Sequence, residues 1–171
     1  MDSHLGKLEQ ALSGAIAGIS AEELTWHPTG KWCVAEVLEH LYLTYTGTVK
    51  GFERVTKAGK SLATPPTVSQ RWRAWMVVGL GHLPEGRKSP AMAQPRGLPP
   101  EQVLSVIIPA IGQMDEIIAR CEKAIGPGKE LLDHPILGPL TAKQWRKFHL
   151  VHGLHHVKQI RRLRSARVAT S

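Results

Sequence analysis

Apolar residues recur every three to four positions over four long stretches of the chain, which is the period of an amphipathic helix. The pattern predicts helices over residues 3–18, 34–58, 99–125 and 141–166. Strand signals are nearly absent, and four amphipathic helices bury their apolar faces most simply against one another. The sequence therefore predicts an all-α, single-domain chain that folds as a four-helix bundle over residues 1–171.

The third and fourth predicted helices carry clear boundary signals. Pro99, Pro100 and Glu101 favour a helix start, because proline fits the first turn and a carboxylate complements the helix dipole there. Pro109 lies inside the third helix and should kink it. Thr141 is placed to cap the start of the fourth helix.

Residues 59–98 form a long, proline-rich connector between the second and third helices. A short helix is predicted from Val68 to Gly79, and the rest reads as loop, which at this length is usually functional or disordered. Trp72 and Trp75 could pack the connector onto the helices or line a substrate mouth, and packing is the preferred interpretation. Residues 167–171 are expected to form a disordered tail.

The net charge of +8 is concentrated toward the C-terminus. The cations there are Lys143, Arg146, Lys147, Lys158, Arg161, Arg162, Arg164 and Arg167. Such a stretch can bind nucleic acid or an anionic membrane, but it is more often a solvated helix end whose cations complement the dipole. No named nucleic-acid motif accompanies it, so we expect no nucleic-acid partner.

The remaining composition is that of an ordinary globular protein. Cys33 and Cys121 are far apart and form no CxxC pair, which makes a disulfide framework unexpected and a reducing cytoplasm the default compartment. The N-terminal stretch MDSHLGKLEQ has no apolar core of a signal peptide. No uninterrupted run of about 18 apolar residues occurs, so we expect no membrane span.

Four of the nine histidines fall in the stretch FHLVHGLHH, namely His149, His152, His155 and His156. Imidazole is the commonest protein ligand for zinc and related ions. On a helix, three of them share one narrow stripe, whereas His155 lies about 120° away from His149. The i, i+4 pair His152 and His156 can grip one metal ion, although the glutamate of the HExxH motif is absent.

A catalytic metal ion usually takes three protein ligands and leaves one position for water or substrate. His40 is the best third candidate, because it flanks the apolar stripe of the helix predicted over 34–58. His149 competes with it, as a general base, a group that supports the ligands or a substrate contact. A lone helical histidine such as His40 is more often structural than a metal ligand. For the pair His152 and His156, a structural role and a metal-binding role are equally expected.

Two sequence blocks carry a family resemblance. WHPTGKWCVAEVLEHL, over residues 26–41, and WRKFHLVHGLHHVKQI, over residues 145–160, resemble the histidine-bearing motifs of the DinB-like (damage-inducible, YfiT-type) superfamily. The stretch HPILGPLT, over residues 134–141, is similar to the lead-in of one branch. Together these blocks cover about a quarter of the chain, and no motif is recognised in the centre.

The resemblance implies a four-helix bundle with an up-down-down-up arrangement and a metal triad of His40, His152 and His156. It also implies a divalent ion, with nickel or zinc favoured, and frequent homodimers. Characterised relatives include S-transferases and isomerases that use low-molecular-weight thiols such as mycothiol or bacillithiol. The family name records induction by damage and does not imply binding to DNA.

Cys33 stands where the family usually has a serine that caps the second helix. We expect a weaker cap, and Glu36 would complete the capping box. The Cys33 thiol could be reactive at a helix N-terminus, but a buried small hydrophobe is the preferred interpretation. Glu36 could also accept the second ring N–H of His40.

Other groups near the triad have supporting roles in this prediction. Gln159, one turn beyond His156, could accept the second ring N–H of that histidine. His149 and His155 are expected to support the ligands, contact substrate or pack.

We therefore expect a divalent-metal-dependent enzyme, either a thiol-dependent S-transferase or a metal-assisted hydrolase, acting on a small molecule that the sequence does not identify. The alternative is a non-catalytic metal-binding or small-molecule-binding helical module. A structural metal site would have all four positions filled by protein ligands.

Overall fold

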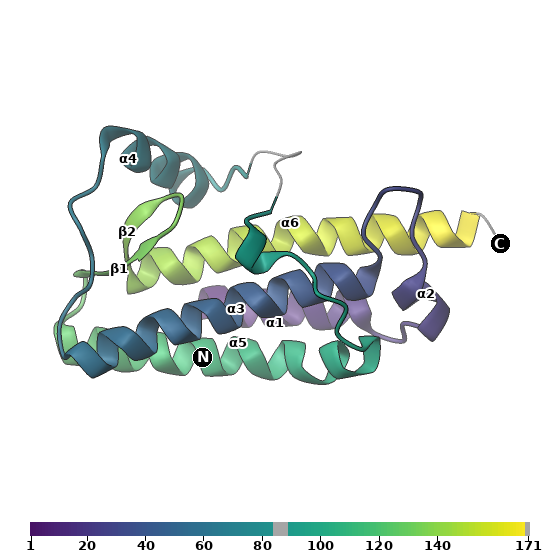
Figure 1. Ribbon diagram of the computed structural model, residues 1–171, viewed down its shortest axis with the longest axis horizontal. Helices are drawn as coiled ribbons and strands as arrows, with labels where there is room; N and C mark the ends of the chain where they lie inside the picture. Colours follow the sequence, from purple (N-terminus) through teal and green to yellow (C-terminus); the bar gives the residue numbers. More distant parts are fainter. Residues whose placement is uncertain (84–88, 170–171) are drawn as a thin grey trace.

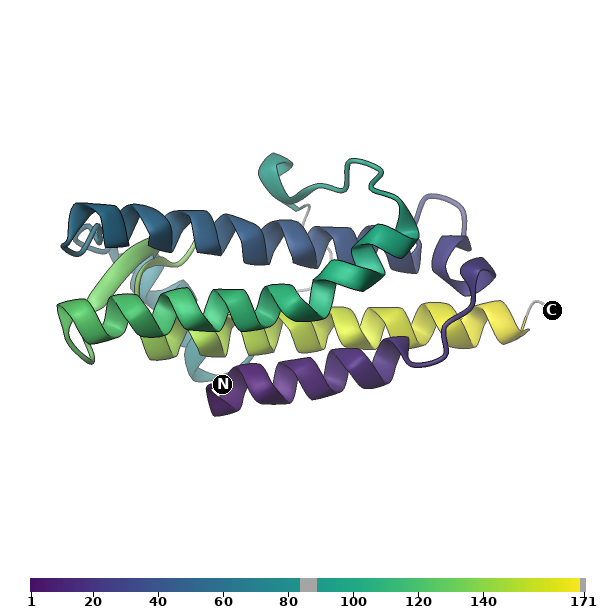
Figure 2. The same cartoon turned by 90° about the horizontal axis from the view of Figure 1, so that it is seen from below.

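The computed structural model describes residues 1–83 and 89–169, and it is mostly helical with a small two-stranded sheet. The longest helices lie side by side (Figure 1). They are α1 (Ser3–Ile16), α3 (Val34–Ala58), α5 (Pro100–Ile125) and α6 (Ala142–Ala169). Helix α3 packs mainly against α5, and α1 packs mainly against α6. Figure 2 shows α1 and α6 running in one direction and α3 and α5 in the opposite one.

The apolar stripes that predicted these helices form the core between them. Leu5, Leu8 and Leu12 of α1 are fully buried, as are Tyr45 of α3 and Ile111 of α5. Burying an aliphatic or aromatic side chain of this size contributes about 1.5–3 kcal/mol. The predicted helical content is therefore confirmed, and its stability comes from the contact between helices rather than from any helix alone.

Helices α1 and α6 approach each other closely at Gly153. A Cβ atom at this position would collide with the side chain of Leu8, which is itself fully buried. The missing side chain thus lets the two helix backbones come together. Because Gly153 follows His152 directly, this contact also sets the position of α6 where its histidines lie.

Two predicted helix boundaries and one predicted bend are confirmed. Helix α3 has the bounds expected from the sequence, and Glu36 accepts the backbone N–H of Cys33 at 2.8 Å. Thr141 caps α6, since its Oγ1 accepts the N–H of Gln144 at 3.2 Å and its own N–H donates to Gln144 Oε1 at 2.9 Å. Helix α5 contains Pro109, and Figure 2 shows the expected bend.

The expectation that strands are absent was wrong. Strands β1 (Glu130–His134) and β2 (Gly138–Thr141) form an antiparallel hairpin, with Leu132 opposite Leu140. Each strand is too short to show a clear alternation of apolar and polar residues. A short helix, α2 (Ala21–Thr25), was missed for the same reason, although Ser20 and Glu23 form its capping box.

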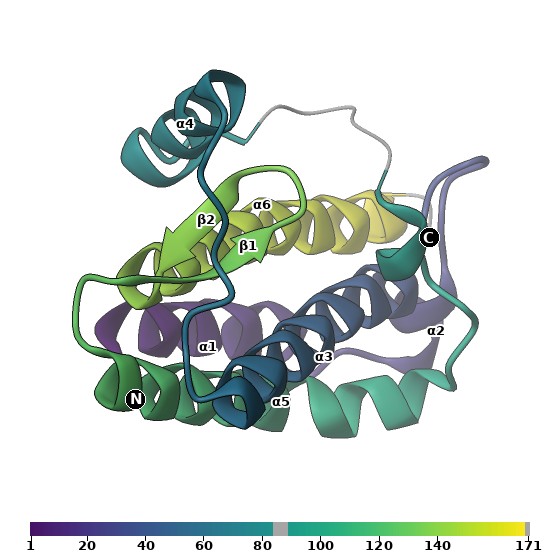
Figure 3. The same cartoon turned by 60° about the vertical axis from the view of Figure 1, so that its left-hand side comes forward.

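The long connector contains the short helix predicted there. Helix α4 (Val68–Ala74) continues as a π-helix, η1 (Trp75–Gly79), and a 3₁₀ turn, η2 (Ala91–Ala93), follows. The expected packing of Trp72 and Trp75 was wrong, because their exposed fractions are 58% and 51%. Their rings stack on each other, and α4, which buries no residue, stands out above the hairpin (Figure 3).

The predicted disordered tail begins too early. Helix α6 continues to Ala169, so residues 167–169 are helical, whereas residues 170–171 lie outside the described part. Two cations near the end of α6 contact α2: Arg164 Nε lies 2.8 Å from Glu23, and Arg167 lies 3.1 Å from Glu22. These ion pairs and the continuing backbone hydrogen bonds order the end of the helix.

Helix α5 is long and apolar enough to cross a membrane by length and composition alone. A core helix of a globular protein passes the same test. The apolar face of α5 is buried against its neighbours, and its Asp115 forms a buried salt bridge with Arg146 of α6 at 2.8 Å. We therefore describe α5 as a core helix.

Candidate metal centre

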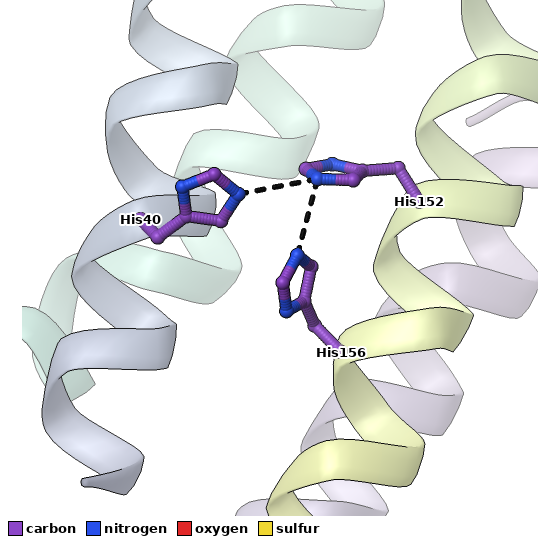
Figure 4. Close-up of side chains that lie close together, drawn as sticks. All are labelled: His40, His152 and His156. Carbon is purple, nitrogen blue, oxygen red and sulfur yellow. Dashed lines mark hydrogen bonds between the residues drawn. The ribbon is translucent and has the colours of Figure 1, made fainter. Parts of the chain in front are cut away.

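Three histidines from two helices converge in the space between α3 and α6 (Figure 4). The Nε2 atom of His152 lies 3.2 Å from Nε2 of His40 and 3.1 Å from Nε2 of His156. The exposed fractions of the three residues are only 4% for His40, 9% for His152 and 7% for His156. The structure thus brings together the three residues singled out in the sequence as a metal triad.

The spacing of these nitrogens suits a shared cation. Two imidazole nitrogens that bind one zinc ion tetrahedrally, each at about 2.05 Å, lie about 3.3 Å apart. The two measured separations are 3.2 and 3.1 Å. Each ring nitrogen carries either one proton or one lone pair, so His152 Nε2 can make only one full hydrogen bond with its two neighbours. A cation would satisfy all three lone pairs at once.

The ring of His40 is oriented by the segment that covers it. Its Nδ1 lies 2.7 Å from the carbonyl oxygen of Ala93 and 3.2 Å from Ser89 Oγ. A carbonyl only accepts, so Nδ1 donates its proton and Nε2 keeps a lone pair that faces the other histidines. The prediction that Glu36 accepts from His40 was wrong, because that carboxylate is hydrogen-bonded to the N–H of Cys33.

Sequence reasoning missed the role of Glu39. This carboxylate is buried and accepts the backbone N–H groups of Arg96, Gly97 and Leu98, at 2.7, 3.1 and 3.1 Å. It thereby fastens residues 89–98, which we call the strap, to α3 next to His40. A buried glutamate on an otherwise apolar helix face was the available signal, but its partners lie almost 60 residues away in a loop.

The two histidines of α6 are held in different ways. His156 Nδ1 lies 2.9 Å from Gln159 Oε1, the contact expected from the sequence, so this ring also presents its Nε2 lone pair to the centre. His152 stacks on Phe148, with the ring planes 8° apart. Its Nδ1 has no hydrogen-bond partner among the described residues. Packing and the neighbouring Gly153 therefore set the orientation of His152.

His149 lies outside this group. It is fully buried, its Nε2 lies 3.0 Å from Thr48 Oγ1, and its ring stacks on Trp145. Because α3 and α6 run in opposite directions, the residue one turn before His152 faces the part of α3 one turn or more after His40. The contacts of His149 with Thr48 and Trp145 favour the packing alternative, and its roles as a substrate contact or a general base stay predictions.

His155 lies beside the group rather than within it. Its ring is half-buried, and its centroid is 5.0 Å from that of His156, at nearly a right angle. It remains a candidate for supporting His156 or contacting a substrate.

Burial lowers the pKa of all three clustered imidazoles. It lowers the pKa of His40, lowers the pKa of His156 to about 3, and holds the pKa of His152 well below its ordinary value. The three rings are therefore neutral at pH 7, which leaves their lone pairs available to a cation without competition from protons.

Cys33 does not have the character of a reactive thiol. It is buried, and desolvation raises its pKa. The effect of the helix N-terminus is outweighed by the cost of placing a thiolate away from water. The preferred interpretation of Cys33 as a small buried hydrophobe is thus the one that the structure supports.

Three neutral nitrogen donors leave a cation with its full charge and an open position. Among residues 1–83 and 89–169, no fourth histidine, cysteine, aspartate or glutamate joins the group of His40, His152 and His156. A closed structural zinc site would need that fourth protein ligand. The donor set fits a site at which water or a small molecule completes the coordination.

Comparison with known proteins gives one match. Residues 7–163 match the model of a family described as "Protein of unknown function (DUF1569)". No curated protein and no solved structure matches the chain.

Proposed function

The chain belongs to the DUF1569 family, and from the site itself we propose that it is a divalent-metal-dependent enzyme with His40, His152 and His156 as ligands. The observation that carries the proposal is the convergence of three Nε2 atoms, from two separate helices, at separations of 3.2 and 3.1 Å. Such an arrangement of buried rings is costly unless something binds it, because it places lone pairs together away from water.

We propose zinc or nickel as the ion, since imidazole suits both. When bound, a cation with three neutral ligands lowers the pKa of a thiol or water at its open position and makes a nucleophile available at neutral pH. The reaction class is transfer of a low-molecular-weight thiol to an electrophilic carbon, or metal-assisted hydrolysis. In the transfer, the sulfur–carbon bond forms, the leaving group departs with its electron pair, and the thiol proton passes to solvent.

The chain's own residues supply orientation and a dry environment. The Ala93 carbonyl and Gln159 hold the proton on Nδ1 of His40 and His156, which fixes Nε2 as the ligating atom of each ring. The strap fastened by Glu39 contacts His40, and the three histidines are at most 9% exposed, which limits the entry of water. A small thiol can therefore compete with water for the open position.

We further propose that the fold is a four-helix bundle of the DinB-like type. Support comes from the side-by-side long helices and their opposed directions (Figures 1 and 2), and from the clustering of the histidines that the resemblance implies. We also propose that the protein is a homodimer and that it acts in the cytoplasm. Cys33 and Cys121 are both free thiols, which fits a reducing compartment.

A non-catalytic metal-binding module is the second candidate. The observation that favours it is the small exposure of the three histidines, at most 9% each, which restricts the approach of a substrate. The absence of a fourth ligand among the described residues favours the enzyme.

The test uses untagged protein loaded with zinc or nickel. The protein is incubated with cysteine, mycothiol or bacillithiol and 1-chloro-2,4-dinitrobenzene, and separately with p-nitrophenyl acetate. We expect metal-dependent acceleration with at least one thiol or with the ester, lost in His156→Ala and kept in His27→Ala, an exposed histidine that is not part of the cluster. A metal-loaded protein that accelerates none of these reactions would be a binding module instead.

A further inference from the structure

A hollow lies between the π-helix η1, strand β2 and the first turns of α6. Its volume is about 420 Å³, which is within the range of small-molecule sites. Figure 3 shows α4 standing above the hairpin, and η1 continues that helix back toward α6. The wall combines cations, an aromatic ring and an apolar floor.

The charge of this hollow is strongly positive. Arg71, Lys143 and Lys147 line it, and Glu130 is the one carboxylate among the lining residues. None of the three cations forms an ion pair with another described residue; Lys147 Nζ lies 3.3 Å from the carbonyl oxygen of Gly79. Three cations around one concavity focus a positive potential, which attracts an anionic ligand.

An exposed aromatic face adjoins these cations. Trp75 lines the hollow, and its exposed fraction is 51%. Its ring is held in place, because Trp72 stacks on it with centroids 5.0 Å apart and Gly79 lies against its edge. Val78 and Leu137 supply buried apolar surface at the floor.

The backbone at this wall is the end of a helix. Residues Trp75–Gly79 form a π-helix that closes the C-terminal end of α4, and the N–H of Leu80 donates to the Trp75 carbonyl at 3.1 Å. Wide turns of this kind occur at helix C-termini. Trp75, Val78 and Gly79 of this turn all line the hollow.

The hollow is separate from the histidine centre. Lys147 and His152 both belong to α6, but they are five residues apart, which is about 7.5 Å along the helix axis and about 140° around it. The two side chains therefore leave the helix on different faces, and none of the three clustered histidines lines the hollow.

We propose that this hollow binds a small organic anion, with a carboxylate, sulfonate or phosphate on a planar apolar group. The anionic group lies among Arg71, Lys143 and Lys147, and the planar group lies against Trp75. Cations supply the attraction and the aromatic face supplies apolar contact, so binding requires both parts of the ligand.

The test uses the full chain and two probes of similar shape and different charge. The anion is 8-anilinonaphthalene-1-sulfonate, and the uncharged counterpart is N-phenyl-1-naphthylamine; binding is followed by probe fluorescence. We expect saturable binding of about one sulfonate per chain, at least tenfold weaker for the uncharged probe, and weakened by added sodium chloride, since salt screens exposed charges.

Variants then place the probe. The double variant Lys143→Ala/Lys147→Ala and the single variant Trp75→Ala are expected to raise the Kd of the sulfonate about tenfold, which corresponds to about 1.4 kcal/mol. Lys158→Ala, an exposed cation further along α6, and His152→Ala in the metal centre are the matched controls and should leave that Kd unchanged. Circular dichroism checks that each variant is folded.

Two outcomes would overturn the proposal. One is equal affinity for the charged and uncharged probes in the wild-type protein, which needs no variant. The other is an unchanged Kd for the sulfonate in both hollow variants while they remain folded.

Discussion

Removing the carboxylate of Glu39 is the sharpest perturbation of the metal centre that leaves its three ligands in place. Glu39 accepts three backbone N–H groups of the strap. A hydrogen bond to a charged group contributes about 1.5–3 kcal/mol, so three such bonds would sum to about 4.5–9 kcal/mol if all the freed groups stayed buried. Arg96 and Gly97 lie at the surface and can bind water instead.

We therefore expect Glu39→Ala to lower the free energy of unfolding by about 2–4 kcal/mol, which is less than that sum because water replaces part of the lost hydrogen bonding. The released strap also withdraws the Ala93 carbonyl from His40 Nδ1, where it now lies at 2.7 Å. Loss of a group that orients a ligand typically weakens metal binding about 10–100-fold. Glu39→Gln keeps a neutral acceptor and should have an intermediate effect.

The assay is competition for zinc between the protein and a chromophoric chelator, combined with urea unfolding of the metal-free protein. Glu36→Ala is the matched control, because it removes a glutamate of the same helix that accepts a single backbone N–H away from the strap. Its zinc affinity should equal that of the wild type. A folded Glu39→Ala protein that binds zinc within twofold of the wild-type affinity would refute the reasoning.

Three further predictions concern the packing around the centre. Gly153→Ala forces a Cβ against buried Leu8 and should cost about 1–3 kcal/mol in urea unfolding, as overpacking does; a neutral effect would mean that the two helices separate freely. Arg146→Met leaves the buried Asp115 carboxylate with only the backbone N–H of Asp2 as a partner among the described residues and should cost about 3 kcal/mol, whereas an unchanged midpoint would show that this one hydrogen bond is sufficient. Burial lowers the pKa of His149 to about 3. In the unfolded chain this imidazole binds a proton below about pH 6.5, whereas in the folded chain it stays neutral down to about pH 3. The contribution of the neutral His149 to stability is therefore complete above pH 6.5 and declines on acidification by up to about 1.4 kcal/mol per pH unit. Urea midpoints measured between pH 7 and 4 should fall less steeply in His149→Phe than in the wild type. An equal dependence of the midpoint on pH in the two proteins would contradict this.

Long-period patterns in the sequence predicted most of the helical frame. The bounds of α3 and the start of α5 followed from apolar spacing and from Pro99 and Pro100, because helices of 25 or 26 residues show many repeats of the period. The hairpin could not be predicted, because its strands are short. Strands of five and four residues contain too few positions for a pattern, and their pairing depends on packing against α6.

In the candidate site, too, contacts between residues close in the sequence could be predicted, and contacts between distant residues could not. The pair His152 and His156 could be found because one helical turn separates them, and His40 followed from its place beside an apolar stripe. The partners of these rings could be found only when they were local. Gln159 lies three residues from His156, whereas the Ala93 carbonyl and the strap meet α3 through tertiary contacts more than 50 residues distant.

The position of His149 shows what a helical projection leaves out. It shares the stripe of His152 and His156, yet it contacts Thr48 and Trp145 instead of the cluster. A helical projection gives the angle of a side chain around the helix axis. Which residues of two antiparallel helices touch also depends on their positions along that axis. Those positions are set by contacts such as the one between Gly153 and Leu8.

The metal content of the purified protein tests the central claim most directly. Untagged wild-type protein and the variants His40→Ala, His152→Ala and His156→Ala are loaded with zinc, freed of excess ion by gel filtration and analysed by mass spectrometry. The account predicts one ion per chain in the wild type and almost none in each variant. Full stoichiometry retained in all three variants would contradict it.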